Sequence, residues 1–187
     1  MAILGITASQ ISGHLYAGPF GAYDALASVT VGSGGASSIS FTGIPSTYKH
    51  LQVRMLVNAS STSQAIMSFN GDTSSSNYSF HALIGNGSSA SAAGYATGTL
   101  GGIVPSPRMG GGSYFGAAVV DILDYANTNK NKTTREIMGW DGNGSGEVEL
   151  VSGCWYNNTT AINSISFVIQ GGGNFVQYSS FALYGVR

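Results

Sequence analysis

Residues 49–57 read Lys-His-Leu-Gln-Val-Arg-Met-Leu-Val and hold the clearest pattern in the chain. Every second side chain from Leu51 to Val57 is apolar, so these side chains fall on one face of an extended strand. This period of two is typical of a strand that covers a core with one face. The stretch therefore predicts a β-strand with Leu51, Val53, Met55 and Val57 in the core.

Similar short segments lie on both sides of this stretch, and helical spacing is not sustained anywhere. Gly, Ser and Asn separate these segments, as they do between the strands of β-proteins. Further strands are predicted at 27–31, 38–42, 64–69, 78–84, 94–100, 115–125, 133–140, 147–156, 161–170 and 179–186. Many short strands without helices predict an all-β fold, an antiparallel two-sheet β-sandwich that resembles a jelly roll.

Two turn motifs predict particular connections. Gly32-Ser33-Gly34-Gly35 lies between the strands predicted at 27–31 and 38–42, and Asn70-Gly71 follows the strand at 64–69. Both sequences favour tight turns, so each predicts a hairpin. Two low-complexity stretches, 86–98 and 101–112, are predicted to be surface loops because Gly and Ser are flexible and Pro disfavours central strands.

The chain of 187 residues is long enough for one domain, predicted at 27–187. Residues 1–26 lack sustained alternation, and Gly and Pro interrupt them. We predict that they form an N-terminal docking arm; the alternative is a peripheral strand and loop of the same domain. The arm's candidate interface residues are His14, Tyr16, Phe20 and Tyr23.

Only 8% of the residues are charged, against roughly 25% in ordinary soluble domains. Charge normally keeps exposed sheet faces and edges from pairing between molecules. Its scarcity predicts a surface that is covered by other copies or by a larger particle; solvation by hydroxyl and amide groups is the alternative. The net charge of −1 favours neither nucleic acid nor an anionic membrane as a partner.

The chain's start lacks the features of a secretory signal, and no apolar run approaches the length of a membrane span. Cys154 is the only cysteine, so an intrachain disulfide is excluded and a buried apolar role is expected. These features predict synthesis in the cytoplasm.

The carboxylates give no evident catalytic pair. Asp121 and Asp124 are three residues apart on a predicted strand, so they should lie on opposite faces. Glu147 and Glu149 share a face, which we interpret as the solvent side of a hairpin strand. No catalytic residue is predicted.

No metal site or cofactor is predicted either. The turn 141–146 resembles the start of a calcium-binding loop, but Ser152 stands at the position where a bidentate Glu is needed. A plain turn is the favoured interpretation, with a weak surface cation at Asp141 or Glu147 as the alternative. The histidines, His14, His50 and His81, are widely spaced and do not form a zinc motif.

Two further groups have a local and a functional interpretation. Lys130, Lys132 and Arg135 are predicted to form a solvated basic loop, with contact to an acidic neighbour as the alternative. Aromatic and amide side chains near strand ends either pack at the edge of the sandwich or contact a glycan. These candidate glycan contacts are Tyr78, Trp155, Tyr156 and Asn157.

Five segments, in order, resemble a group of small virion structural proteins of tailed bacteriophages, especially aquatic ones. They are IPSTYKHLQVR (44–54), FNGD (69–72), NYS (77–79), DILDYANTNKNKTTR (121–135) and FVQYSSFALYGVR (175–187). The resemblance spans about residues 27–187 and brings no catalytic residue with it.

The resemblance implies a non-enzymatic structural protein on the virion exterior, made in the host cytoplasm. We expect a homo-oligomer, with a trimer favoured, that binds the major capsid protein as a decoration or cement protein. The alternative is a tail or tail-fibre component that binds tail proteins or a host surface glycan as a receptor module.

Overall fold

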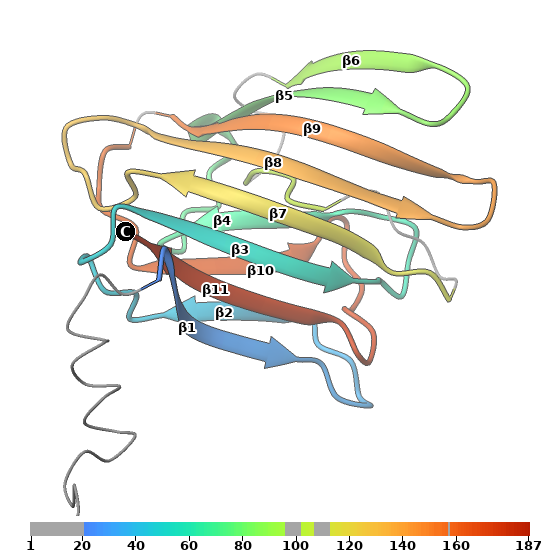
Figure 1. Cartoon of the computed structure of the whole chain (residues 1–187), viewed down its shortest axis with the longest axis horizontal. Helices are drawn as coiled ribbons and strands as arrows, with labels where there is room; N and C mark the ends of the chain where they lie inside the picture. The colour runs from blue at the N-terminus through green and yellow to red at the C-terminus, as the bar shows by residue number, and fades with distance from the viewer. Residues whose placement is uncertain (1–20, 96–101, 107–112, 157) are drawn as a thin grey trace, which may run out of the picture.

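The computed structural model describes residues 21–95, 102–106, 113–156 and 158–187, which fold as two antiparallel sheets (Figure 1). The strands are β1 (Tyr23–Thr30), β2 (Ser38–Thr42), β3 (His50–Val57), β4 (Ala65–Phe69), β5 (Tyr78–Gly85), β6 (Ala90–Tyr95), β7 (Gly116–Leu123), β8 (Lys132–Asp141), β9 (Gly146–Trp155), β10 (Ser164–Ile169) and β11 (Ser180–Val186). Among the described residues, the one helical element is a 3-10 turn, η1 (Ser75–Asn77), which precedes β5. The predicted all-β, two-sheet sandwich is confirmed.

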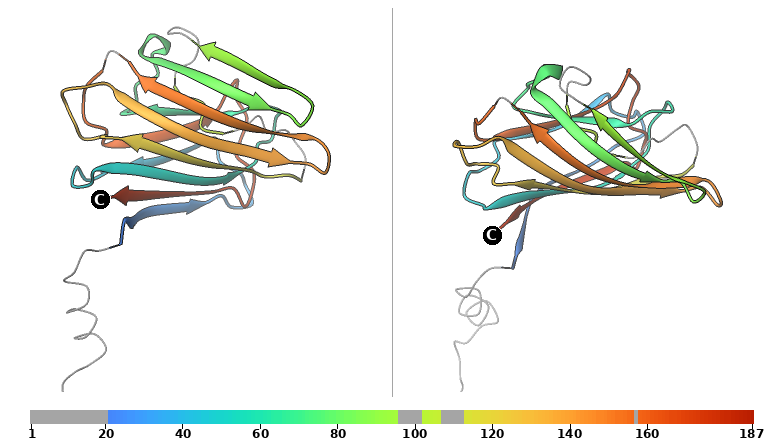
Figure 2. Two further views of the ribbon diagram at one scale, coloured as in Figure 1. Left: turned by 45° about the horizontal axis from the view of Figure 1, so that its top comes forward. Right: turned by 90° about the horizontal axis from the view of Figure 1, so that it is seen from above.

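The larger sheet has the order β1-β11-β3-β7-β8-β9-β5-β6, and the smaller one has the order β2-β10-β4. Figure 2 shows the small sheet packed behind one side of the large one. The last strands of the chain are inserted between the first: β11 separates β1 from β3, and β10 separates β2 from β4. This interleaving is the wrapping of a jelly roll.

The core lies between the sheets. The predicted inner face of β3 is confirmed, because Leu51, Val53, Met55 and Val57 are all buried. Aromatic rings join the layers: Phe167 on β10 lies 5.3 Å, centroid to centroid, from Phe181 on β11. No helix in the described residues is long and apolar enough to cross a membrane.

Both predicted hairpins are wrong, although most of the strands were correctly located. The strand before Gly32 pairs with β11, whereas β2 pairs with β10, so the turn leads from one sheet to the other. Asn70 and Gly71 do have the positive φ values of a tight turn, 52° and 71°. However, β4 pairs with β10 and β5 pairs with β6 and β9. A local turn sequence fixes the direction of the chain but not the partner of the next strand.

The domain begins earlier than predicted. Tyr23 already pairs with Val186, so residues 23–26 belong to the edge strand β1 and not to an arm. Residues 23–26 therefore agree with the alternative prediction, a peripheral strand of the same domain. Residues 1–20, which hold the rest of the predicted arm, lie outside the described residues.

The two predicted surface loops also need correction. Residues 90–95 form β6, because their backbone pairs with β5 even though the side chains are small. In the second loop, residues 102–106 are buried. Ile103 exchanges two backbone hydrogen bonds with Met67, of 2.7 and 2.9 Å, and so extends the small sheet beyond β4. For the strand predicted at 94–100, residues 96–100 are outside the described part.

Candidate functional site

The side of the large sheet that faces away from the small one carries an apolar surface. Leu83, Leu150 and Ile137 lie on β5, β9 and β8, directly opposite one another in the strand register, and Val119 continues the row on β7. Their exposed fractions are 51% for Leu83, 50% for Leu150 and 55% for Ile137, and Val148 beside them is 58% exposed. We call Leu83, Val119, Ile137, Val148 and Leu150 the outer apolar patch.

A polar row borders the outer apolar patch on the same face of the sheet, two residues away along each strand. It consists of His81, Ser152, Arg135, Asp121 and Gln52, which are aligned across β5, β9, β8, β7 and β3. Nε2 of Gln52 donates a 2.8 Å hydrogen bond to Oδ1 of Asp121. A shallow hollow of about 500 Å³ covers part of both rows. An apolar centre with a polar border is the usual anatomy of a protein interface.

Toward β1 the polar row ends in an aromatic cluster. Nε of Arg54 donates a 2.7 Å hydrogen bond to Oε1 of Gln52. Its guanidinium lies 5.2 Å from the ring centroid of Tyr23 and 4.7 Å from that of Tyr184. Tyr23 was predicted as an interface residue of the arm; it instead lies on β1, half exposed, against the sheet. His14, Tyr16 and Phe20 lie outside the described residues.

The opposite face of the same strands holds carboxylates. Glu149 is 6% exposed, so its predicted place on the solvent side is wrong. Val151 and Trp155 share its side of β9 and pack in the core, which turns Glu149 inward and Leu150 outward. Glu147 also shares this side and is partly buried. The strand therefore has both of its carboxylates on the inner side, while Val148 and Leu150 lie on the outer side.

Glu136 on β8 is the most deeply placed carboxyl group, with 4% exposure. Burial raises its pKa to about 8; the hydrogen bond from Thr134 lowers it and the negative charge of Glu149 raises it. Oγ1 of Thr134 donates a 2.8 Å hydrogen bond to Oε1 of Glu136, while Oε2 has no hydrogen-bond partner among the described residues. At neutral pH this group is mostly protonated.

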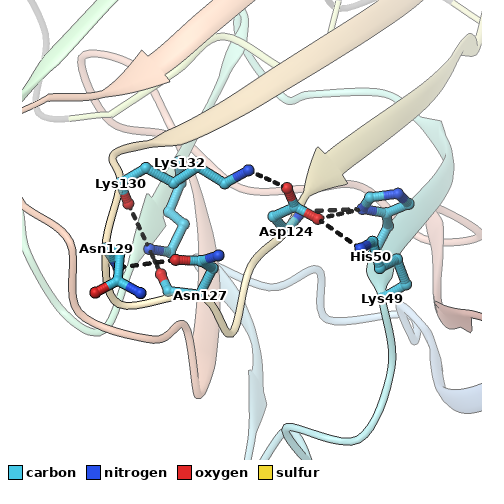
Figure 3. Close-up of polar contacts among 7 residues, drawn as sticks. All are labelled: Lys49, His50, Asp124, Asn127, Asn129, Lys130 and Lys132. Carbon is cyan, nitrogen blue, oxygen red and sulfur yellow. Dashed lines mark hydrogen bonds and ion pairs between the residues drawn. The ribbon is translucent and has the colours of Figure 1, made fainter.

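Asp121 and Asp124 do not form a pair. Asp121 belongs to the polar row, whereas Asp124 lies in the turn after β7, forms ion pairs with Lys49 and Lys130, and lies beside His50 (Figure 3). The hydrogen bond from Lys130 holds the pKa of Asp124 below its usual value; burial opposes this, and the nearby positive charges support it. Both residues were expected on one strand, but β7 ends at Leu123, so Asp124 lies beyond the strand.

The three residues of the predicted basic loop, Lys130, Lys132 and Arg135, do not lie together in the structure. Lys132 is fully buried, and its Nζ donates hydrogen bonds to the backbone carbonyl oxygens of Asn127 and Lys130 (Figure 3). It donates a third one, of 2.9 Å, to the carbonyl oxygen of Thr159. Burial, and then the charge of Lys130, lower its pKa. Arg135 lies on the outer face of β8, away from this loop. Lys132 is therefore not solvated as predicted, whereas Lys130 and Arg135 are exposed.

Two of the four candidate glycan contacts are core residues. Tyr78 and Trp155 are each 1% exposed, with stacked rings whose centroids are 6.4 Å apart. Nε1 of Trp155 donates a 2.8 Å hydrogen bond to Oδ2 of Asp72. Tyr78 and Trp155 therefore cannot stack on a sugar. Tyr156 is 44% exposed, and Asn157 is outside the described residues.

The turn 141–146 joins β8 to β9, as the plain-turn interpretation predicted. Oδ1 of Asp141 accepts a 2.8 Å hydrogen bond from the backbone N–H of Asn143, and Asn143 has a φ of 59°. In residues 21–95, 102–106, 113–156 and 158–187, no group of three His, Cys, Asp or Glu side chains is placed to hold a metal ion.

Comparison with known proteins adds little to this geometry. No family model and no curated protein matches the chain. A solved structure of a mutant alginate lyase in complex with an alginate tetrasaccharide is 10% identical, covers 90% of this chain and 99% of its own, and has a TM-score of 0.24. At this TM-score, the likeness carries no argument about function.

The outer apolar patch was not recognised in the sequence. Glu147 to Leu150 alternate between acidic and apolar residues, and the usual expectation places the acidic ones in solvent. The signal that would have corrected this is Trp155, because a large aromatic residue on the same side as Glu149 indicates that this side is the inner one.

Proposed function

We propose that this chain is a non-enzymatic structural protein of a tailed-bacteriophage particle, located on the particle exterior and assembled through the outer face of its large sheet. Capsid decoration is the preferred role, and a place on the tail is the alternative. The observation that carries this proposal is the outer apolar patch: aliphatic side chains aligned across four adjacent strands and open to solvent. Contiguous apolar patches of this kind mark contact surfaces.

The composition supports the same conclusion. A monomeric protein would be expected to place charged residues on an open sheet face. In this chain, Glu136 and Glu149 lie inside while Ile137 and Leu150 lie outside. Apart from Asp121, Arg135 and Arg54 beside it, the outer apolar patch lacks charged neighbours on its own strands among the described residues. Such an arrangement favours a face that is buried in an assembly.

Three of the five segments that resemble virion proteins also lie together. Residues 44–54, 121–135 and 175–187 include the first part of β3, the end of β7 with the start of β8, and β11, which are neighbours in the large sheet. The hydroxyl of Tyr125 donates a hydrogen bond to the carbonyl oxygen of Pro45, and the backbone N–H of Asp124 donates one of 2.9 Å to Nδ1 of His50. These segments form one structural unit, which supports their use as evidence for a shared fold.

Particle association tests the proposal. Particles are purified on a density gradient from lysates in which the chain is expressed during infection, and the chain is quantified in the particle fraction. We expect the wild-type chain in that fraction, with Ile137→Lys lowering its amount by about tenfold or more because a buried charge is costly. The matched control is Val168→Lys, since Val168 is 43% exposed on the small sheet. Absence of the wild-type chain from the particles would refute the proposal.

A further inference from the structure

We propose that the outer face of the large sheet binds the same face of a second copy of this chain, forming a two-fold symmetric dimer. This inference rests on the proposed function only in taking the outer face to be an assembly surface. It replaces the sequence-based expectation of a trimer, and it names the first partner as the chain itself. Two-fold dimers bring identical patches together, so the face must be complementary to itself.

The charges on the central strands meet this requirement. Asp121 on β7 and Arg135 on β8 lie directly opposite each other in the register. A two-fold axis that runs along the strands, midway between β7 and β8, places β7 of one copy on β8 of the other. Asp121 then faces Arg135 of the second copy, and Arg135 faces Asp121 of the second copy. Opposite charges therefore meet twice.

The same axis brings apolar residues together at the centre of the next rows, while Arg54 on β3, which flanks Val119, faces Leu150 on β9 of the second copy. Val119 lies opposite Ile137 in the register. Val119 of one copy therefore faces Ile137 of the second copy, and Ile137 faces Val119 of the second copy. One row further, Leu56 on β3 faces Val148 on β9 of the second copy. Ala117 and Gly139 occupy the central strands of that row and leave room for close approach. Sheets that stack face to face align their strands to within about 30°, which keeps these rows matched near the axis.

The area of the face is sufficient for a stable dimer. Six adjacent strands, from β11 to β5, with a spacing of about 4.8 Å and about eight residues of about 3.3 Å each, cover roughly 750 Å². Standard interfaces bury about 800 Å² on each partner. The outer face therefore has the size of a whole interface and not of a minor contact.

Charge also distinguishes a second copy from an unrelated partner. The centre of the face carries one acidic and one basic side chain, Asp121 and Arg135, on neighbouring strands. A partner surface of a single charge sign would leave one of them opposite a like charge, which disfavours binding. The second copy offers the opposite sign at both positions. The charge pattern therefore favours the chain itself as the occupant.

Sedimentation equilibrium of the purified full chain tests the dimer. We expect a dimer whose dissociation constant rises by about tenfold or more in Ile137→Lys. Val168→Lys, the same change on the exposed face of β10, should leave the dimer unchanged. Circular dichroism melting confirms that both variants fold. A monomeric wild-type chain, or an Ile137→Lys variant that dimerises normally, would overturn the inference.

A charge exchange tests the symmetry itself. Asp121→Arg and Arg135→Asp should each weaken the dimer, because each places two pairs of like charges in contact. The double variant restores opposite charges across the axis and should restore dimerisation; continued monomeric behaviour of a folded double variant would overturn the two-fold arrangement. Particle association is a separate measurement, so a dimer that never reaches particles would refute the proposed function alone.

Discussion

Ile137 and Leu150 lie directly opposite each other on β8 and β9, and both side chains project away from the core, at 55% and 50% exposure. Their chain neighbours Glu136 and Glu149 point inward and are buried. This inversion of the usual polarity defines the large sheet: its inner side tolerates carboxyl groups, and its outer side offers an apolar surface.

Glu136→Gln should stabilise the protein at neutral and mildly alkaline pH. The folded-state pKa of Glu136 is raised to about 8, above its value in the unfolded chain, so the folded state holds a proton that the unfolded state releases. Stability from this group is therefore full at low pH and falls as pH rises from about 5 to about 8. The amide removes this loss and keeps an acceptor for Thr134. We expect a gain of about 1–3 kcal/mol in unfolding free energy at pH 8.

Urea unfolding at several pH values measures this effect. Glu147→Gln serves as the control, because Glu147 is less buried on the same side of β9. Equal pH dependence in the wild-type protein and Glu136→Gln would contradict the assignment of a protonated carboxyl group.

Asp72→Asn should destabilise the sandwich and change its behaviour in acid. Burial raises the pKa of Asp72, but hydrogen bonds from Trp155, Asn77 and the backbone of Ser74 outweigh it and hold the pKa below its usual value. The stabilisation is therefore present above about pH 4 and lost as pH falls further. The amide has one acceptor oxygen for three donors, so we expect a loss of about 1–3 kcal/mol at pH 7.

Thermal melting at pH 7 and pH 3 checks this prediction. The wild-type protein should lose more stability between these values than the variant does. Asp141→Asn is the matched control, because Oδ1 of Asp141 accepts one backbone hydrogen bond, from Asn143, in an exposed turn. A variant as stable as the wild type at pH 7 would rule out this anchoring role.

Trp155→Ala should unfold or severely destabilise the protein, with a cost of about 3–5 kcal/mol. The indole is packed against Tyr78 and Phe69, with ring centroids 6.4 and 5.6 Å away. Tyr156→Ala, which changes an exposed ring, should leave stability within about 0.5 kcal/mol. Denaturant titration separates the two outcomes; a stable Trp155→Ala variant that selectively loses glycan binding would contradict the core assignment.

Gly153→Ala should cost about 1–3 kcal/mol because the site is already filled. A Cβ at this position would lie 2.5 Å from Oγ1 of Thr134 and 2.8 Å from Cγ2 of Ile103. Gly85→Ala is the control, since its Cβ would meet no atom within 4 Å. Chemical denaturation compares them, and equal stability of the two variants would show that residues 102–106 do not pack under β9.

The sequence predicted the strands and the buried face of β3, because alternation within one strand is a local property. It did not predict strand partners, as the turns at Gly32 and Asn70-Gly71 show, since pairing across a jelly roll joins residues far apart in the chain. Alternation also identifies two faces without saying which is inside. For β9 that choice depends on Trp155 and Val151 reaching the core together.

The burial of two candidate site residues could not be predicted from the sequence for the same reason. Lys132 and Trp155 were interpreted from their residue types as a solvated cation and a surface ring. Both are buried because specific acceptors, three carbonyl oxygens for Lys132 and the carboxylate of Asp72 for Trp155, satisfy their polar atoms. Such partners come from other parts of the chain and leave no local signal.

Immunogold labelling of intact, purified phage particles with an antibody against the chain tests whether the chain lies on the virion. We expect regular labelling on the particle exterior, with the label lost from particles prepared with Ile137→Lys and retained with Val168→Lys. Unlabelled particles, with all of the chain left in the soluble fraction of the lysate, would contradict the claim that it is a virion structural protein.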